Sequence, residues 1–187
     1  RGAEEFLEME RDIPIIFVTG GSQGALNLND VLLDILPSLI KRYQIVHQTG
    51  KNNFVETKRR ANFLLDGNEF QKRYKPFAYL NETALRMIGG TTKLVISRAG
   101  STIFEIAAWG VPSIIIPIKE EVSHDQRSNA FTYARSGAAI VIEEKNLSGT
   151  ILLSEIDRIM SSPELLDGMK NKALNFSPKD ASYKIAK

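Results

Sequence analysis

The sequence predicts an α/β domain, a doubly wound six-stranded parallel sheet with helices on both faces. Two observations lead to this prediction. From residue 13 onward, short β-branched runs alternate with longer amphipathic segments, a pattern typical of repeated strand–helix units. Runs such as IIFV at 15–18 and SIII at 113–116 are apolar on both faces, as in strands that are covered by helices on each side.

The strands are assigned from β-branched and aromatic runs bounded by turn residues. The strongest is the first, because a glycine-rich turn follows it directly. The six expected strands are Ile13–Thr19, Gln44–Gln48, Pro76–Leu80, Leu94–Ser97, Ser113–Ile118 and Ala138–Ile142.

The helices are assigned from the amphipathic segments between these strands, with Gly110 and Gly137 as expected helix stops. The five helices between strands are expected at Leu26–Lys41, Phe54–Leu65, Thr83–Ile88, Thr102–Trp109 and Gln126–Ser136. After residue 142 the pattern is wholly helical, and Pro163 suits the first turn of a helix. Expected there are Gly149–Met160, Pro163–Ala173 and a last segment after Pro178.

The chain has 187 residues, which corresponds to about one domain. Its first stretch, RGAEEFLEMERD, is charged and lacks both an initiator Met and the layout of a secretory signal. We therefore expect residues 1–12 to be a linker or tail from a missing amino-terminal domain. Residues 13–175 are expected to form the folded domain, and residues 176–187 a C-terminal helix or tail.

The composition narrows the possible functions. With 43% hydrophobic residues, 25% charged residues and a net charge of +2, the chain resembles an ordinary globular protein and gives no reason to expect nucleic acid as a partner. The absence of Cys excludes disulfides, zinc–thiolate sites and thiol catalysis. No apolar run approaches the ~18 residues needed to cross a bilayer.

Ligands of open parallel sheets bind at the carboxyl ends of the strands, so the turns that follow strands are the candidate sites. The first is Gly20–Ala25, sequence GGSQGA, which lies between a strand and a helix. Backbone N–H groups at such a helix start favour an anion, most naturally phosphate. The turn matches neither the Walker A pattern nor G-x-G-x-x-G, and its glycines can equally be structural.

The second turn is Ser97–Thr102, sequence SRAGST, followed by Glu105. Two glycine–hydroxyl turns on neighbouring strands could hold a diphosphate from two directions. The alternative is a capping box, in which Thr102 caps the helix and Glu105 reaches back to the cap N–H.

The third turn is Ser123–Gln126, sequence SHDQ, whose donors and acceptors suit sugar hydroxyls. Here too Ser123 and Gln126 match a capping box. The only histidines, His47 and His124, lack a carboxylate at ligand spacing, so no metal site is expected. No Ser/His/Asp set and no evident general base is present.

Taken together, these turns resemble the C-terminal, donor-binding half of the MurG family of glycosyltransferases. The family adds N-acetylglucosamine to a lipid-linked muramyl-peptide precursor in peptidoglycan synthesis. The resemblance extends over about Ile13–Ala173. Its motifs are GGSQGA at 20–25, HQTG at 47–50, SRAG at 97–100, FEIAAWGVPSIIIP at 104–117 and DQRSNA at 125–130.

The resemblance implies the C-terminal, Rossmann-like half of a two-domain GT-B fold that binds UDP-N-acetylglucosamine (UDP-GlcNAc). It implies that Glu105 accepts hydrogen bonds from the ribose, and that Tyr79 and Leu80 present backbone groups to uracil. It also implies that Asp125 and Gln126 hold the N-acetylglucosamine. Arg98 is expected to shape its loop. The residues implied for the diphosphate and sugar are Gly21, Ser22, Gln23, Gly24, Gly100, Ser101 and Thr102.

The resemblance further implies an inverting transfer to undecaprenyl-pyrophosphoryl-muramyl-pentapeptide, with no obligatory cofactor. The family's amino-terminal half holds the acceptor site and the catalytic base, so no catalytic residue is expected in this chain. It should bind the donor without turning it over. The whole enzyme is expected to be cytoplasmic, peripheral on the cytoplasmic face of the plasma membrane.

Two alternatives remain at this point. The chain could be a separate donor-binding subunit that works with an acceptor-binding partner protein. It could instead belong to a nucleotide-sugar epimerase of GT-B architecture, although no residue favours that interpretation.

Overall fold

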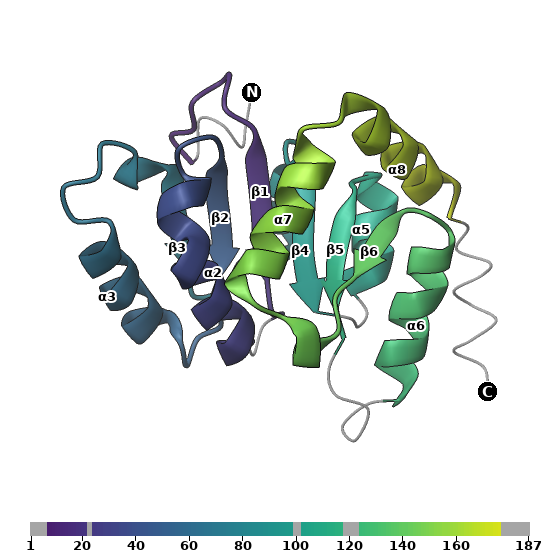
Figure 1. The fold of residues 1–187 in the computed structure, drawn as a ribbon, viewed down its shortest axis with the longest axis horizontal. Coiled ribbons are helices and arrows are strands. Elements are labelled where there is room, and N and C mark those ends of the chain that lie inside the picture. The colour runs from purple at the N-terminus through teal and green to yellow at the C-terminus, as the bar shows by residue number, and fades with distance from the viewer. Residues whose placement is uncertain (1–6, 22–23, 99–101, 118–123, 177–187) are drawn as a thin grey trace.

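The computed structural model describes residues 7–21, 24–98, 102–117 and 124–176. Within these residues, six parallel strands form one sheet in the order β3-β2-β1-β4-β5-β6. The strands are β1 Ile15–Thr19, β2 Gln44–Gln48, β3 Tyr74–Phe77, β4 Leu94–Arg98, β5 Ser113–Ile116 and β6 Ala139–Val141. The predicted doubly wound α/β fold is confirmed (Figure 1).

The helices alternate with the strands up to β6, and two consecutive helices follow. The α-helices of the described residues are α2 Leu26–Leu39, α3 Phe54–Leu64, α4 Glu82–Gly89, α5 Thr102–Trp109, α6 His124–Arg135, α7 Gly149–Met160 and α8 Pro163–Asn175. Short 3₁₀ turns are η1 Gln71–Arg73 and η2 Glu144–Asn146. Gly110 and Gly137 follow the ends of α5 and α6, as predicted. The segment predicted after Pro178 lies outside the described residues.

The core has one layer on each face of the sheet, because successive side chains of a strand point to opposite faces. In β1, Ile16 and Val18 pack with α2, α3 and α7 on one face. Ile15 and Phe17 pack with α4, α5 and α6 on the other. Figure 1 shows α2 and α7 across the near face of the sheet and α5 behind it. This two-sided burial explains why β1 and β5 consist mainly of consecutive apolar residues.

The third strand differs from its prediction. It spans Tyr74–Phe77 and not Pro76–Leu80, because Tyr74 pairs with Ile45 and starts the strand two residues earlier. Pro76 is accommodated because β3 lies at the edge of the sheet, where a missing N–H leaves no central ladder incomplete. Tyr79 and Leu80 therefore follow the strand as a loop.

The start of α6 also differs from its prediction. Helix α6 begins at His124, two residues earlier than predicted, which puts Asp125 and Gln126 in its first turn. Ser123, the cap residue of the capping-box alternative, lies outside the described residues. Helix α5 spans Thr102–Trp109, as predicted.

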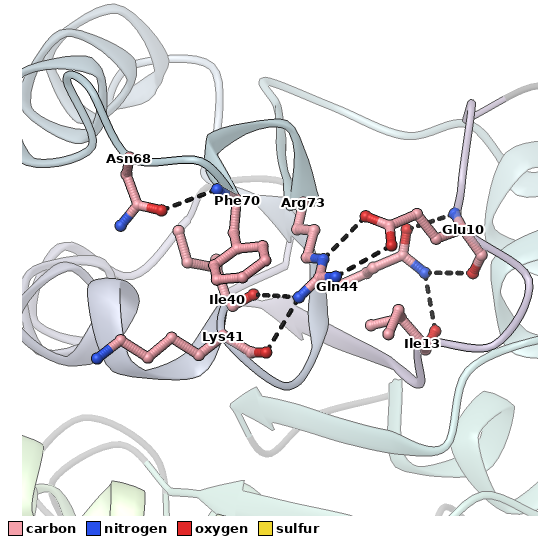
Figure 2. Close-up of polar contacts among 8 residues, drawn as sticks. All are labelled: Glu10, Ile13, Ile40, Lys41, Gln44, Asn68, Phe70 and Arg73. Carbon is pink, nitrogen blue, oxygen red and sulfur yellow. Dashed lines mark hydrogen bonds and ion pairs between the residues drawn. The ribbon is translucent and has the colours of Figure 1, made fainter.

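A polar junction at the amino edge of the sheet anchors the chain before β1 (Figure 2). Arg73 donates to both carboxylate oxygens of Glu10 at 2.8 and 3.0 Å and to the carbonyls of Ile40 and Lys41 at 3.0 Å. Its guanidinium lies 4.3 Å from the centre of the Phe70 ring. Hydrogen bonding to Arg73 lowers the pKa of Glu10. The junction therefore ties the ends of α2 and η1 to the segment that enters β1.

Replacing Arg73 with lysine is expected to lower the free energy of unfolding by about 2 kcal/mol, because an ammonium cannot reproduce the four directed hydrogen bonds. Urea unfolding measures the change. Arg86→Lys is the matched control. Arg86 pairs with Glu82 on the exposed face of α4, where a lost ion pair costs less than about 0.5 kcal/mol. Equal losses for the two variants would contradict the prediction.

Candidate nucleotide-sugar site

The two glycine turns begin at the same edge of the sheet. Strands β1 and β4 are parallel neighbours, and Thr19 pairs with Ser97 near their carboxyl ends. From β1 the chain crosses to β2 through α2 on one face, and from β4 it crosses to β5 through α5 on the other. The strand order therefore reverses between β1 and β4, which is where open α/β sheets form a ligand crevice.

The first turn is shaped by its own hydrogen bonds. Gly21 and Gly24 have φ angles of +83° and +78°, which glycine adopts without strain. The Gly21 N–H donates to the Thr19 hydroxyl at 2.9 Å, and the Gly24 N–H donates to the Gly21 carbonyl at 3.1 Å. These two amides therefore shape the turn. Ser22 and Gln23, the central residues of the predicted site, lie outside the described residues.

The start of α2 is suited to an anion. Its N-cap residue is Ala25, which forms no side-chain cap, and the first turn of the helix contains no acidic residue. The first amides of a helix have no partner within it and carry the positive end of the helix dipole. A diphosphate at the β1–α2 turn would face these N–H groups.

The loop after β2 packs directly against this turn. A Cβ atom on Gly24 would lie 2.2 Å from the Thr49 carbonyl oxygen and 3.0 Å from Gly50 Cα. The HQTG motif therefore contributes the surface on which the glycine turn rests. Only glycine at residue 24 permits this approach.

A buried chain of hydrogen bonds holds that loop in place. The Tyr74 hydroxyl lies 2.8 Å from His47 Nδ1, and His47 Nε2 lies 2.8 Å from Asn29 Oδ1. Asn29 Nδ2 donates to the Thr49 carbonyl at 3.0 Å. Because Asn29 Oδ1 can only accept, His47 carries its proton on Nε2 and accepts from Tyr74 on Nδ1. Every polar atom along this path is thereby paired.

Burial determines the protonation states of His47 and Tyr74 in this series of hydrogen bonds. His47 is fully buried, and desolvation lowers its pKa to about 3, so the ring is neutral at physiological pH. Burial raises the pKa of Tyr74, so its hydroxyl stays protonated and can donate. His47 is therefore a structural residue of the β2–α3 region. Across the described part of the chain, no three His, Asp or Glu side chains gather as a metal site would require.

The predicted uracil-binding residues lie in the loop after β3. The Tyr79 side chain is half exposed, and Lys51 Nζ lies 5.0 Å from the centre of its ring. Leu80 is buried, and its N–H donates to Gln48 Oε1 at 2.8 Å. The Leu80 amide thus has an internal partner, which leaves the Leu80 carbonyl and the Tyr79 groups for a base.

The second turn is flanked by an ion pair. Arg98 at the end of β4 bonds to Glu144 of η2 at 2.7 Å, and each side chain is only 15% exposed. Arg98 thus joins the end of β4 to η2. Gly100 and Ser101 lie outside the described residues, as does the side chain of Thr102. Glu105 is exposed one turn into α5, which leaves its carboxylate accessible.

The predicted sugar-binding residues lie at the start of α6. This helix follows β5 in the chain, and β5 lies next to β4 in the sheet. The side chains of Asp125 and Gln126 lie outside the described part of the structure. Thr19 and Gln48 also lie beside the glycine turn and are absent from the predicted set of site residues. Their position at the ends of β1 and β2 is the signal in the sequence that could have indicated them.

A cavity of 310 Å³ lies at the opposite edge of the sheet. Its wall includes Lys93 and Pro112, which directly precede β4 and β5, together with Trp109 and Leu166. None of the predicted site residues lines it. It is therefore separate from the candidate site.

Comparison with known proteins identifies the family. Residues 15–185 match the glycosyltransferase family 28 C-terminal domain. Two similar proteins are UDP-N-acetylglucosamine--N-acetylmuramyl-(pentapeptide) pyrophosphoryl-undecaprenol N-acetylglucosamine transferases. That of Caldanaerobacter subterraneus subsp. tengcongensis is 35% identical, covering 92% of this chain and 46% of its own length. That of Listeria welshimeri is 34% identical, covering 98% and 50%.

Solved structures share the fold. The crystal structure of Acinetobacter baumannii MurG matches with a TM-score of 0.74 at 23% identity, covering 99% of this chain and 52% of that one. The UDP-GlcNAc 2-epimerase from Neisseria meningitidis matches with a TM-score of 0.67 at 11% identity, covering 98% and 47%. The chain thus spans about half the length of the relatives it matches. It belongs to glycosyltransferase family 28, as a C-terminal domain homologous to the C-terminal half of MurG.

Proposed function

We propose that this domain binds UDP-GlcNAc as the donor half of an inverting glycosyltransferase. The observation that carries the proposal is that β1 and β4, the strands that lead into the two glycine turns, are parallel neighbours at the switch point, beside the N-terminus of α2. Helix-start amides would neutralise the diphosphate without requiring a metal ion. The domain would be residues 13–175, against which Leu7 and Met9 of the preceding segment pack and to which Glu10 bonds through Arg73.

In this proposal the loop after β3 holds uracil, Glu105 holds the ribose, and Asp125 and Gln126 hold the N-acetylglucosamine. The acceptor is the lipid-linked muramyl-pentapeptide of the similar transferases. Inversion requires a base that deprotonates the acceptor hydroxyl while UDP leaves, and the amino-terminal half supplies it. The domain alone therefore binds the donor without transferring its sugar.

The whole enzyme works at the cytoplasmic face of the plasma membrane. Every helix in the described residues is too short or too polar to cross a bilayer.

Calorimetric titration of the purified chain with UDP-GlcNAc tests the proposal. We expect saturable binding with a Kd below about 1 mM, and Glu105→Gln to weaken it about tenfold through lost charge-assisted hydrogen bonds. Glu164→Gln is the matched control, because Glu164 is an exposed first-turn residue of α8. A folded sample that shows no saturation at millimolar donor would refute donor binding. Conversion of the free donor to its epimer would instead support the epimerase alternative.

A further inference from the structure

We propose that Gln48 is a positioning residue that couples the diphosphate-binding turn to the uracil-binding loop. This inference rests on the proposed function, because the proposed function places the diphosphate at the β1–α2 turn and uracil at the loop after β3. Gln48 is the last residue of β2, which lies between β1 and β3 in the sheet. The loops that follow β1 and β3 are therefore separated by β2, and Gln48 is placed to reach both.

The contacts of Gln48 form one continuous path. Its Oε1 accepts from the Leu80 N–H at 2.8 Å, and its Nε2 donates to the Thr19 hydroxyl oxygen at 3.0 Å. The same hydroxyl oxygen accepts from the Gly21 N–H at 2.9 Å. Because the Leu80 N–H can only donate, the orientation of the Gln48 amide is determined. The path thus runs from the glycine turn, through Thr19 and Gln48, to the β3–α4 loop.

The burial of this path distinguishes it from a surface contact. Thr19 is 2% exposed, and Gln48 and Leu80 are each 4% exposed. A buried amide is costly unless both of its ends are paired, and an apolar side chain would fill the same space without that requirement. The primary amide also provides a donor and an acceptor at one side-chain end, which the two loops require simultaneously.

The path has a consequence for the ligand. The two loops would hold opposite ends of the UDP moiety, so the spacing between them must match the distance from uracil to diphosphate. Gln48 contributes to this spacing without touching the donor. Its loss should therefore reduce affinity for the whole donor by relaxing both loops.

Gln48→Met tests the inference, because methionine keeps the length of the side chain and removes both hydrogen bonds. We expect about tenfold weaker binding of UDP-GlcNAc. We also expect at least about tenfold faster amide hydrogen exchange at Leu80 and at Gly21. Gly21 is the informative amide, because it contacts Gln48 only through Thr19.

Two further variants separate coupling from loss of stability. Thr92→Val removes another buried hydroxyl, which donates to the Ile15 carbonyl at 3.1 Å at the opposite edge of the sheet. It should leave donor affinity and both exchange rates unchanged at a temperature where the variants are equally folded. Thr19→Ser keeps the hydroxyl and should retain affinity, whereas Thr19→Val should reproduce the effect of Gln48→Met.

The outcomes distinguish this inference from the proposed function. If the unsubstituted chain binds the donor and Gln48→Met binds it equally well, Gln48 does not position the site. If the unsubstituted chain does not bind the donor, the proposed function fails, and hydrogen exchange alone decides the coupling. In that case faster exchange at Leu80 without faster exchange at Gly21 overturns the coupling.

Discussion

Gly24→Ala is expected to lower the free energy of unfolding by about 3 kcal/mol. Two effects add at this position. The φ angle of +78° is strained for any residue with a Cβ, and the new methyl group would lie 2.2 Å from the Thr49 carbonyl oxygen. The backbone of the HQTG loop cannot move away easily, because the buried Asn29 side chain bonds to the same carbonyl. Urea unfolding at constant m-value measures the loss.

Gly21→Ala is the matched control for this prediction. Gly21 has a similar φ of +83°, but apart from its chain neighbours no heavy atom of the described residues lies within 4 Å of the position that its Cβ would occupy. It should lose only the cost of the left-handed conformation, about 1 kcal/mol. The difference between the two variants therefore measures the close approach of the two loops. Equal losses would show that Gly24 and Thr49 are not in tight contact.

Acidification should destabilise the domain through His47. The pKa is about 3 in the folded state and 6.5 as the ordinary value, so between these values the unfolded chain binds more protons than the folded one. The contribution of His47 to the free energy of unfolding is therefore fully present above pH 6.5 and is lost as the pH falls towards 3. The slope from this group is up to about 1.4 kcal/mol per pH unit.

The comparison of wild type with His47→Gln isolates this contribution. The variant should be less stable at pH 7, because glutamine cannot bond to both Tyr74 and Asn29 in the same geometry. As the pH falls from 7 to 4.5, the difference in unfolding free energy between the two proteins should shrink. Ionisable groups that the substitution leaves in place contribute equally to both proteins and cancel. Parallel stability curves would show that His47 is not buried as a neutral ring.

The site was predicted from the sequence only as far as backbone position allowed. The GGSQGA and SRAG turns follow strands, and such turns lie at the carboxyl edge of any parallel sheet. The boundary of β3 was wrong, because Tyr74 joins the sheet through pairing with Ile45, a contact that local propensity does not encode. Tyr79 and Leu80 were identified through family resemblance, and their roles remain proposals.

The sequence by itself determined the alternation of strands and helices, because burial on both faces leaves a periodic signal in local residue choice. The two glycine turns and the family membership followed from short contiguous motifs. Only the tertiary structure decided that Gln48 joins Thr19 and Leu80, which lie 29 and 32 residues away. It also decided that His47 is neutral and structural. Both depend on strand order and register, which arise from packing across the whole sheet and leave no periodic pattern in the sequence around either residue.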